Sequence, residues 1–258
     1  MIVANEPAET SIEPTIQQIA PKAAIWSALP TLSVEPAAME RQRLVSFQRR
    51  HPAALAFDIM RTKLLKDARS QHWTSIGITS PTAGCGKATV AANLAVSLTR
   101  HDKVRVVIVD LDLRRPRIAA LFGHSGRYTM TDFLRRDCLI EDLVVRIGMN
   151  LAIGASPDIN NNPAELLHAQ NTAVTLAHLR ETLRADIVIY NLPSLLESDD
   201  CLGLLPLVDT TLLVVGAEHS TINEIDVSER QLQTQTKLLG VVLNKCRYKS
   251  GAAANFEV

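Results

Sequence analysis

The segment TSPTAGCGKATVAANLA, residues 79–95, has the residue types of a loop that binds phosphate groups and leads into a helix. Gly84 and Gly86 let the backbone turn so that successive N–H groups can face an anion, and Lys87 adds a positive charge. The N-terminus of the following helix contributes a further partial positive charge. A glycine-rich turn that carries a surface lysine is the alternative interpretation.

The same segment departs twice from the phosphate-loop pattern G-x-x-x-x-G-K-[ST]. Pro81 stands at the first position and Ala88 at the last, where a hydroxyl group would bind a metal ion. Thr89 lies about 100° further around the helix, so its hydroxyl does not simply replace the missing one. We expect the loop to bind the phosphates of a nucleotide through Gly84, Cys85, Gly86, Lys87, Ala88 and Thr89.

Two carboxylates follow an apolar run in the segment VVIVDLDLRRP. Asp110 and Asp112 are two positions apart, which places both side chains on one side of an extended strand. Carboxylate oxygens at a strand end suit a hard cation together with phosphates, so this pair is a candidate metal site. A helix cap or a turn is the alternative. Arg114 and Arg115 could clamp anionic oxygens or pair with surface carboxylates.

Asparagines end two later apolar runs, DIVIYN and GVVLN. In nucleotide-hydrolysing folds a strand of the first kind ends in an aspartate that holds magnesium or its water, and here Asn191 takes that position. The amide of Asn244 could donate to and accept from the edge of an adenine. A turn-forming role is the alternative for Asn244.

All these residues follow short apolar runs that alternate with helical stretches. The runs are SIGIT, VRVVIV, NLAI, DIVIY, TTLLVV and GVVLN. Their alternation predicts an α/β doubly wound fold, with a mostly parallel sheet covered on both faces. Ligands bind beyond the carboxyl ends of the strands in such folds. An amphipathic helix with Phe57, Met60 and Leu64 on one face is expected before the first strand.

We expect a proline- and alanine-rich, disordered tail over residues 1–50, one domain over 51–250 and a short tail over 251–258. Trp26 in the first tail could dock on a partner or be a stray apolar residue. The 258 residues carry 27 basic and 27 acidic side chains, so no overall field favours nucleic acid as a partner. The cysteines form no C-x-x-C pair and no long apolar run occurs, which is typical of a cytoplasmic protein with free thiols.

The segments VDLDLRRP, LFG, TDFLRR and NPAELL, in this order, resemble the bacterial tyrosine kinases (BY-kinases, CpsD/CapB-like) of capsule and exopolysaccharide synthesis. That family is a branch of the MinD/ParA-like P-loop proteins, and the resemblance covers residues 57–245. It implies a P-loop NTPase fold in which Lys87 is the phosphate-binding lysine of the Walker A motif. It also implies that Asp110 and Asp112 are the Walker A′ pair, which engages magnesium and the attacking hydroxyl.

The chain departs from the family pattern at several positions besides the missing hydroxyl. Asn191 replaces the Walker B aspartate. Arg61 matches the last arginine of the family's E-x-x-R-x-x-R oligomerisation helix, whose other two positions are Leu55 and Asp58. The C-terminal segment contains one tyrosine, Tyr248, where the family typically has a cluster that becomes phosphorylated.

The resemblance and the departures together predict a kinase-like protein of polysaccharide assembly that binds ATP or ADP and has weak or absent phosphotransfer. The substitutions put Mg²⁺ binding in doubt. The resemblance implies a membrane-embedded, Wzz-like chain-length regulator as partner and leaves homo-oligomers open. Two alternatives are an active tyrosine kinase with unusual metal ligation and a MinD/ParA-like ATPase switch. Thr82 stands where the switch proteins have a signature lysine, which counts against the second alternative.

Overall fold

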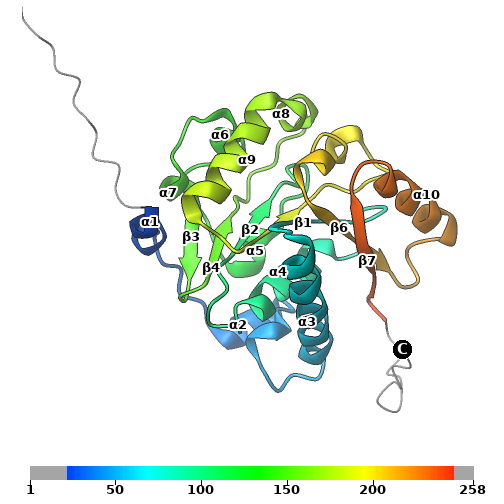
Figure 1. Ribbon diagram of the computed structural model, residues 1–258, viewed down its shortest axis with the longest axis horizontal. Helices are drawn as coiled ribbons and strands as arrows, with labels where there is room; N and C mark the ends of the chain where they lie inside the picture. The colour runs from blue at the N-terminus through cyan, green and yellow to red at the C-terminus, as the bar shows by residue number, and fades with distance from the viewer. Residues whose placement is uncertain (1–21, 247–258) are drawn as a thin grey trace, which may run out of the picture.

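Figure 1 shows a sheet that carries helices on both of its faces. The computed structural model describes residues 22–246 of the chain. In the sheet the strands lie in the order β3-β4-β2-β5-β1-β6-β7. Their bounds are β1 Ser75–Thr79, β2 Val106–Asp110, β3 Val144–Ile147, β4 Leu151–Gly154, β5 Ile187–Asn191, β6 Thr210–Gly216 and β7 Lys237–Asn244.

Neighbouring strands pair in parallel except β3 and β4, which are antiparallel. The predicted α/β fold and its six apolar strands are therefore confirmed. Every residue of β1, β2, β5 and β6 is buried, as expected for strands covered on both sides. The sequence did not predict β3, because its four residues VVRI include an arginine and form no long apolar run.

The helices divide between the two faces of the sheet. Alternate residues of β2 show the division, because Ile108 packs with α3, α4 and α5 whereas Val107 and Val109 pack with α6 to α10. The helix bounds are α3 Ala54–Gln71, α4 Lys87–Leu98, α5 Ile118–Phe122, α6 Met130–Arg135, α7 Ile140–Leu143, α8 Ala164–His168, α9 Gln170–Leu183 and α10 Ile222–Gln233, with short 3₁₀ turns η2 Asp199–Cys201 and η3 Leu205–Leu207. The predicted amphipathic helix is α3.

Much of the segment expected to be a tail packs on the domain. Residues 22–50 contain α1 Lys22–Ala28, α2 Pro36–Arg41 and the 3₁₀ turn η1 Val45–Phe47. Trp26 is buried and its indole N–H donates to the carbonyl of Met149 at 2.9 Å, while Leu44 is fully buried. Prolines between these short elements do not prevent folding, because Pro36 sits in the first turn of α2, where it loses no hydrogen bond. Residues 1–21 lie outside the described part.

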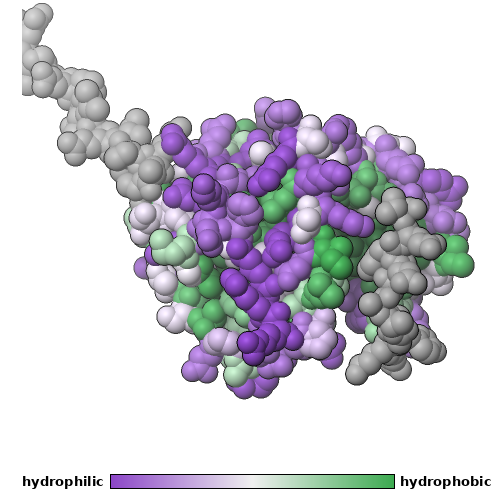
Figure 2. Space-filling model, turned by 60° about the horizontal axis from the view of Figure 1, so that its bottom comes forward, coloured by the Kyte–Doolittle hydropathy of each residue, from purple (hydrophilic) through white to green (hydrophobic). Residues whose placement is uncertain are grey.

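At the other end, β7 leads to Cys246, and residues 247–258 with Tyr248 lie outside the described part. The cysteines at 85, 138, 201 and 246 are free thiols, as predicted. Among residues 22–246, no helix combines the length and the apolar character needed to cross a membrane. Polar side chains cover much of the face seen in Figure 2, with apolar patches between them.

Candidate functional site

Two glycines shape the loop between β1 and α4. Gly84 and Gly86 have φ angles of 85° and 89°, in the left-handed region that favours glycine. A Cβ atom on Gly86 would lie 2.4 Å from Nδ2 of Asn244, so no larger residue fits there without a shift. Asn244 donates through Nδ2 to the carbonyl of Cys85 at 2.9 Å. The end of β7 therefore holds the loop in place, and the adenine contact of Asn244 stays a prediction.

Helix α4 begins at Lys87, directly after this loop. Its sequence, KATVAANLAVSL, is rich in alanine, so the helix can lie close to the sheet, and nearly all its residues are buried. The first turn of a helix has N–H groups without intrahelical partners, and these favour a bound anion. The fold thus places a helix N-terminus at the carboxyl end of β1, as the sequence predicts.

A pocket of about 350 Å³ lies beside the loop. It brings together Gly84, Gly86, Lys87, Ala88, Thr89 and Asp112 from the predicted site. Cys85, which is part of the same loop, is fully buried, and its sulfur lies 3.4 Å from the hydroxyl of Ser220. The lining also includes Arg115, Arg117 and Lys245. Sequence reasoning gave no role to Arg117 and Lys245, although Lys245 follows a strand end, where ligands were expected.

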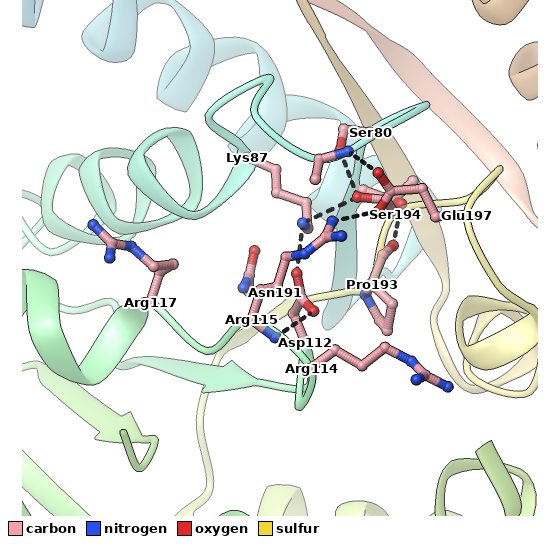
Figure 3. A network of polar contacts seen from close by, with 12 residues as sticks. Ser80, Lys87, Asp112, Arg114, Arg115, Arg117, Asn191, Pro193, Ser194 and Glu197 are labelled. Atoms are coloured by element: carbon pink, nitrogen blue, oxygen red, sulfur yellow. Dashed lines mark hydrogen bonds and ion pairs between the residues drawn. The ribbon is translucent and has the colours of Figure 1, made fainter. Parts of the chain in front are cut away.

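Lys87 and Asp112 form a buried ion pair on one side of this pocket (Figure 3). The Nζ atom of Lys87 lies 2.6 Å from Oδ2 of Asp112 and 3.4 Å from the hydroxyl of Ser194. Lys87 and Asp112 are only 8% and 5% exposed, so water screens the pair weakly. Of the other basic side chains that line the pocket, Arg115 is paired with Glu197, and Arg117 and Lys245 remain to attract an anion.

Asp110 is more deeply buried than Asp112 and faces α5. Its Oδ2 atom accepts the backbone N–H groups of Arg117 and Ile118 at 2.8 and 2.9 Å, at the start of α5. Its Oδ1 atom accepts from Nδ2 of Asn191, its register partner on β5, at 2.7 Å. Burial raises the pKa of Asp110 from 3.8 to about 6, although these hydrogen bonds lower it. In this arrangement the carboxylate caps α5, which is the alternative role that the sequence left open.

A magnesium ion in the predicted place would need oxygen ligands from these residues. Ala88 offers none, both oxygens of Asp110 accept N–H groups, and Asp112 is paired with Lys87. The Oδ1 atom of Asn191 is buried and has no hydrogen-bond partner. Within residues 22–246, no three His, Cys, Asp or Glu side chains form a metal-binding group. Asn191 still offers an unpaired oxygen to a cation, and the doubt about Mg²⁺ binding stays a prediction.

The two arginines after Asp112 bind different carboxylates. Arg114 pairs with the buried carboxylate of Asp200. Burial, the largest single influence, would raise the pKa of Asp200, but the hydrogen bonds from Arg114 and Ser198 and the charges of Arg114 and His168 together lower it. Arg115 donates to Oε2 of Glu197 at 2.5 Å. Both arginines therefore adopt the paired state that the sequence gave as one alternative.

Arg61 lies on α3, away from this pocket. It binds Asp58, one turn earlier on the helix, at 2.9 Å, and Asp58 also binds Arg100 at 2.6 Å. Leu55 is 64% exposed. Two of the three motif positions, Asp58 and Arg61, therefore take part in an ion-pair network with Arg100, and the third is an exposed apolar residue.

The pKa of Asp110 leads to a prediction about stability and pH. Because the folded chain binds this proton more tightly than the unfolded chain, stability is lost as the pH rises through the window from about 4 to 6. The shift of about two units corresponds to a loss of about 3 kcal/mol. Asp110→Asn should remove this loss, because an amide oxygen can still accept from Arg117 and Ile118. Its NH₂ group can donate to Oδ1 of Asn191, which has no partner now, once the amide of Asn191 turns over.

Urea unfolding of both proteins between pH 4.5 and 7.5 measures this difference. We expect the free energy of unfolding of Asp110→Asn to equal or exceed that of the original chain at pH 7.5, with a smaller advantage at pH 4.5. Asp226→Asn, an exposed substitution on α10, serves as the control. A variant destabilised equally at all pH values would show that the charge of Asp110 is needed for folding.

Comparison with known proteins places this site in a family. The CobQ/CobB/MinD/ParA nucleotide binding domain matches residues 76–255. The putative tyrosine-protein kinase EpsB of Ralstonia nicotianae is 32% identical over 200 residues, which are 75% of this chain and 26% of EpsB. The chain thus spans about a quarter of the length of EpsB.

Two further proteins match over most of their length. The tyrosine-protein kinase YwqD of Bacillus subtilis is 31% identical over 188 residues, which cover 72% of this chain and 78% of YwqD. The kinase domain of VpsO superposes with a TM-score of 0.66 at 29% identity, covering 75% of this chain and 96% of that domain. The chain therefore belongs to the bacterial tyrosine kinase family, within the MinD/ParA-like P-loop nucleotide-binding domains.

Proposed function

We propose that this chain is a kinase-like nucleotide-binding protein of capsule or exopolysaccharide biosynthesis in which phosphotransfer is weak or absent. The glycine loop, Lys87 and the start of α4 form the binding site for the phosphates of ATP or ADP. Asn244 lies beside this loop. The observation that carries the proposal is the 2.7 Å hydrogen bond from Asn191 to Asp110. This bond occupies an oxygen of the carboxylate that was expected to bind a metal ion.

Electrostatics explains why this substitution affects catalysis more than binding. Replacing the charge of an aspartate about 4 Å from a cation removes about 4 kcal/mol at an effective dielectric constant near 20. At 1.36 kcal/mol per factor of ten, this slows a metal-dependent step by about a thousandfold. Phosphates can still bind, because the loop N–H groups, Lys87 and the helix N-terminus act without a metal. The catalytic and metal roles predicted for Asp110 and Asp112 remain predictions.

A membrane-embedded, Wzz-like chain-length regulator is the proposed partner. The family of tyrosine kinases supports this, because its members act with such regulators in polysaccharide export. The chain would then work at the inner face of the membrane by binding this regulator, and homo-oligomers are compatible with this role. The balanced charge gives no support to nucleic acid as a partner.

Incubating the purified protein with Mg²⁺ and ATP labelled at the third phosphate tests the proposal. We expect labelled nucleotide to bind without measurable transfer to tyrosine on this chain or on a tyrosine-containing polymer. Acid-stable phosphotyrosine at the level of an active relative such as YwqD would establish an active kinase and contradict the proposal. An ATPase rate raised by a partner would favour the switch alternative.

A further inference from the structure

The carboxylate of Glu197 contacts the backbone of the phosphate loop. Glu197, in the segment between β5 and η2, accepts the backbone N–H of Ala83 through Oε1 at 3.0 Å. Its other oxygen, Oε2, accepts from Nη1 of Arg115 at 2.5 Å. Figure 3 shows Arg115 and Glu197 close to Ser194 and to the Lys87–Asp112 pair. The carboxylate of Glu197 is thus an anion that one loop N–H and one guanidinium already bind.

Arg115 stands between two neighbouring pockets. It lines the pocket beside the phosphate loop and a second pocket of about 340 Å³, which also includes Glu197 and Ser194. Asp112 belongs to both pockets as well. Because Arg115 lines both pockets, its guanidinium borders the space beside the phosphate loop as well as the space beside Glu197.

The ion pair between Arg115 and Glu197 is weak, so another anion can replace Glu197 as the partner of Arg115. The side chains are 57% and 35% exposed, so water screens their attraction and the pair adds little to stability. Arg114 differs, because its partner Asp200 has no exposed surface and would be left as an unpaired buried charge. The segment that carries Glu197 is fixed by hydrogen bonds from Leu195 and Leu196 to the carbonyls of Ser80 and Pro81.

We propose that Arg115 determines specificity for the number of phosphates on the bound nucleotide, and that Glu197 is the internal anion that the outermost phosphate displaces. This inference rests on the proposed nucleotide site. The first turn of α4 binds the inner phosphates, and Lys87 reaches the second and third phosphates, as the lysine of such a loop does. Ala83 comes before both glycines, so its N–H and Arg115 are left for a third phosphate. ADP would leave the Glu197 contacts intact, and ATP would replace them.

Calorimetric titration with ATP and with ADP, in EDTA, tests this exchange. Arg115→Ala should lower the affinity for ATP about tenfold, the size expected for one charge-assisted hydrogen bond, and lower the affinity for ADP less than about twofold. Glu197→Gln should raise the affinity for ATP about fivefold, because the competing charge is gone while the side chain can still accept from Ala83. The informative quantity is the ratio of the two affinities.

Two exposed substitutions on other elements control for charge alone: Arg135→Ala on α6 and Glu181→Gln on α9. They should leave the ratio unchanged, and thermal unfolding should confirm that all variants fold. Equal effects of Arg115→Ala on ATP and ADP, or a ratio unmoved by Glu197→Gln, would overturn the inference while the nucleotide site stands. If the original chain binds neither nucleotide, the proposed function fails as well.

Discussion

Replacing Asp112 with asparagine is expected to tighten ATP binding about tenfold in the absence of a metal, and replacing Lys87 with methionine to weaken it about a hundredfold. Both residues line the pocket and lie 2.6 Å apart. Without a cation to bind, the carboxylate repels phosphates and also competes for Lys87. A unit charge at about 4 Å contributes about 4 kcal/mol at an effective dielectric constant near 20, and rearrangement reduces this.

The free energy of unfolding of each variant shows whether a change in ATP affinity reflects the site or a loss of folded protein. Each single substitution leaves a buried charge without its partner, which costs about 3 kcal/mol or more in the free energy of unfolding. The double variant Lys87→Met/Asp112→Asn contains no such charge and should be close to the original chain in stability. We expect it to bind ATP more weakly than Asp112→Asn does. Urea unfolding and calorimetry on all four proteins measure both quantities.

The direction of the Asp112 effect distinguishes two roles for this residue. If Asp112 held a magnesium ion, Asp112→Asn would weaken the binding of ATP in the presence of Mg²⁺. Tighter binding under both conditions is the result expected here. Weaker binding with Mg²⁺ and unchanged binding in EDTA would assign Asp112 to the metal instead.

The double variant Ala88→Ser/Asn191→Asp is expected to acquire strong dependence on magnesium. Serine supplies the oxygen that Ala88 lacks, and aspartate at 191 stands next to Asp110, whose Oδ1 lies 2.7 Å from the present amide nitrogen. Two carboxylates at this distance share a proton when no cation is present, and both can stay charged only when a cation binds between them. We expect Mg²⁺ to tighten ATP binding about a hundredfold in this variant, which is less than a Coulomb attraction of about 4 kcal/mol would allow.

The single variants show which change is responsible. Ala88→Ser adds an oxygen without a charge, so its gain should be small, and Asn191→Asp alone should give an intermediate gain. Asn171→Asp, an exposed change on α9, controls for the added charge. The same double variant should show phosphate transfer from labelled ATP above the level of the original chain. A double variant that binds ATP equally with and without Mg²⁺ would show that something else in the fold prevents metal binding.

The strands that form the centre of the sheet could be predicted from the amino-acid sequence. Runs such as SIGIT and DIVIY are apolar at nearly every position because both faces of β1 and β5 are covered, and strands exposed on one face alternate instead. The antiparallel strand β3 was missed because its four residues VVRI form no long apolar run and two of them are half-buried. The other edge strand, β7, could be predicted because its sequence KLLGVVLN contains such a run.

Residues 22–50 show a second limit of prediction from the amino-acid sequence. Proline content predicted a tail, but apolar side chains such as Trp26 and Leu44 find places in the core. The binding partners of Trp26 include Met149 and Arg105, which lie far along the chain. Composition cannot predict such contacts because they depend on how the rest of the chain folds.

In the candidate site, the rule that ligands lie beyond strand ends predicted Lys87 and Asp112 in one pocket. The partners of these residues could not be predicted from spacing. Glu197 is 82 positions from Arg115, and Asn191 is 81 positions from Asp110. Whether a carboxylate faces a helix start, as Asp110 does, or a lysine, as Asp112 does, depends on side-chain packing that residue types alone do not determine.

Titration of the original chain with ATP, in EDTA and then in millimolar Mg²⁺, tests the central claim most directly. That claim is that the phosphate-binding half of the site is intact while the metal-binding half is neutralised. We predict binding in both solutions, with affinities within about threefold of each other. Binding that requires Mg²⁺, or that Mg²⁺ tightens about thirtyfold or more, would contradict the claim.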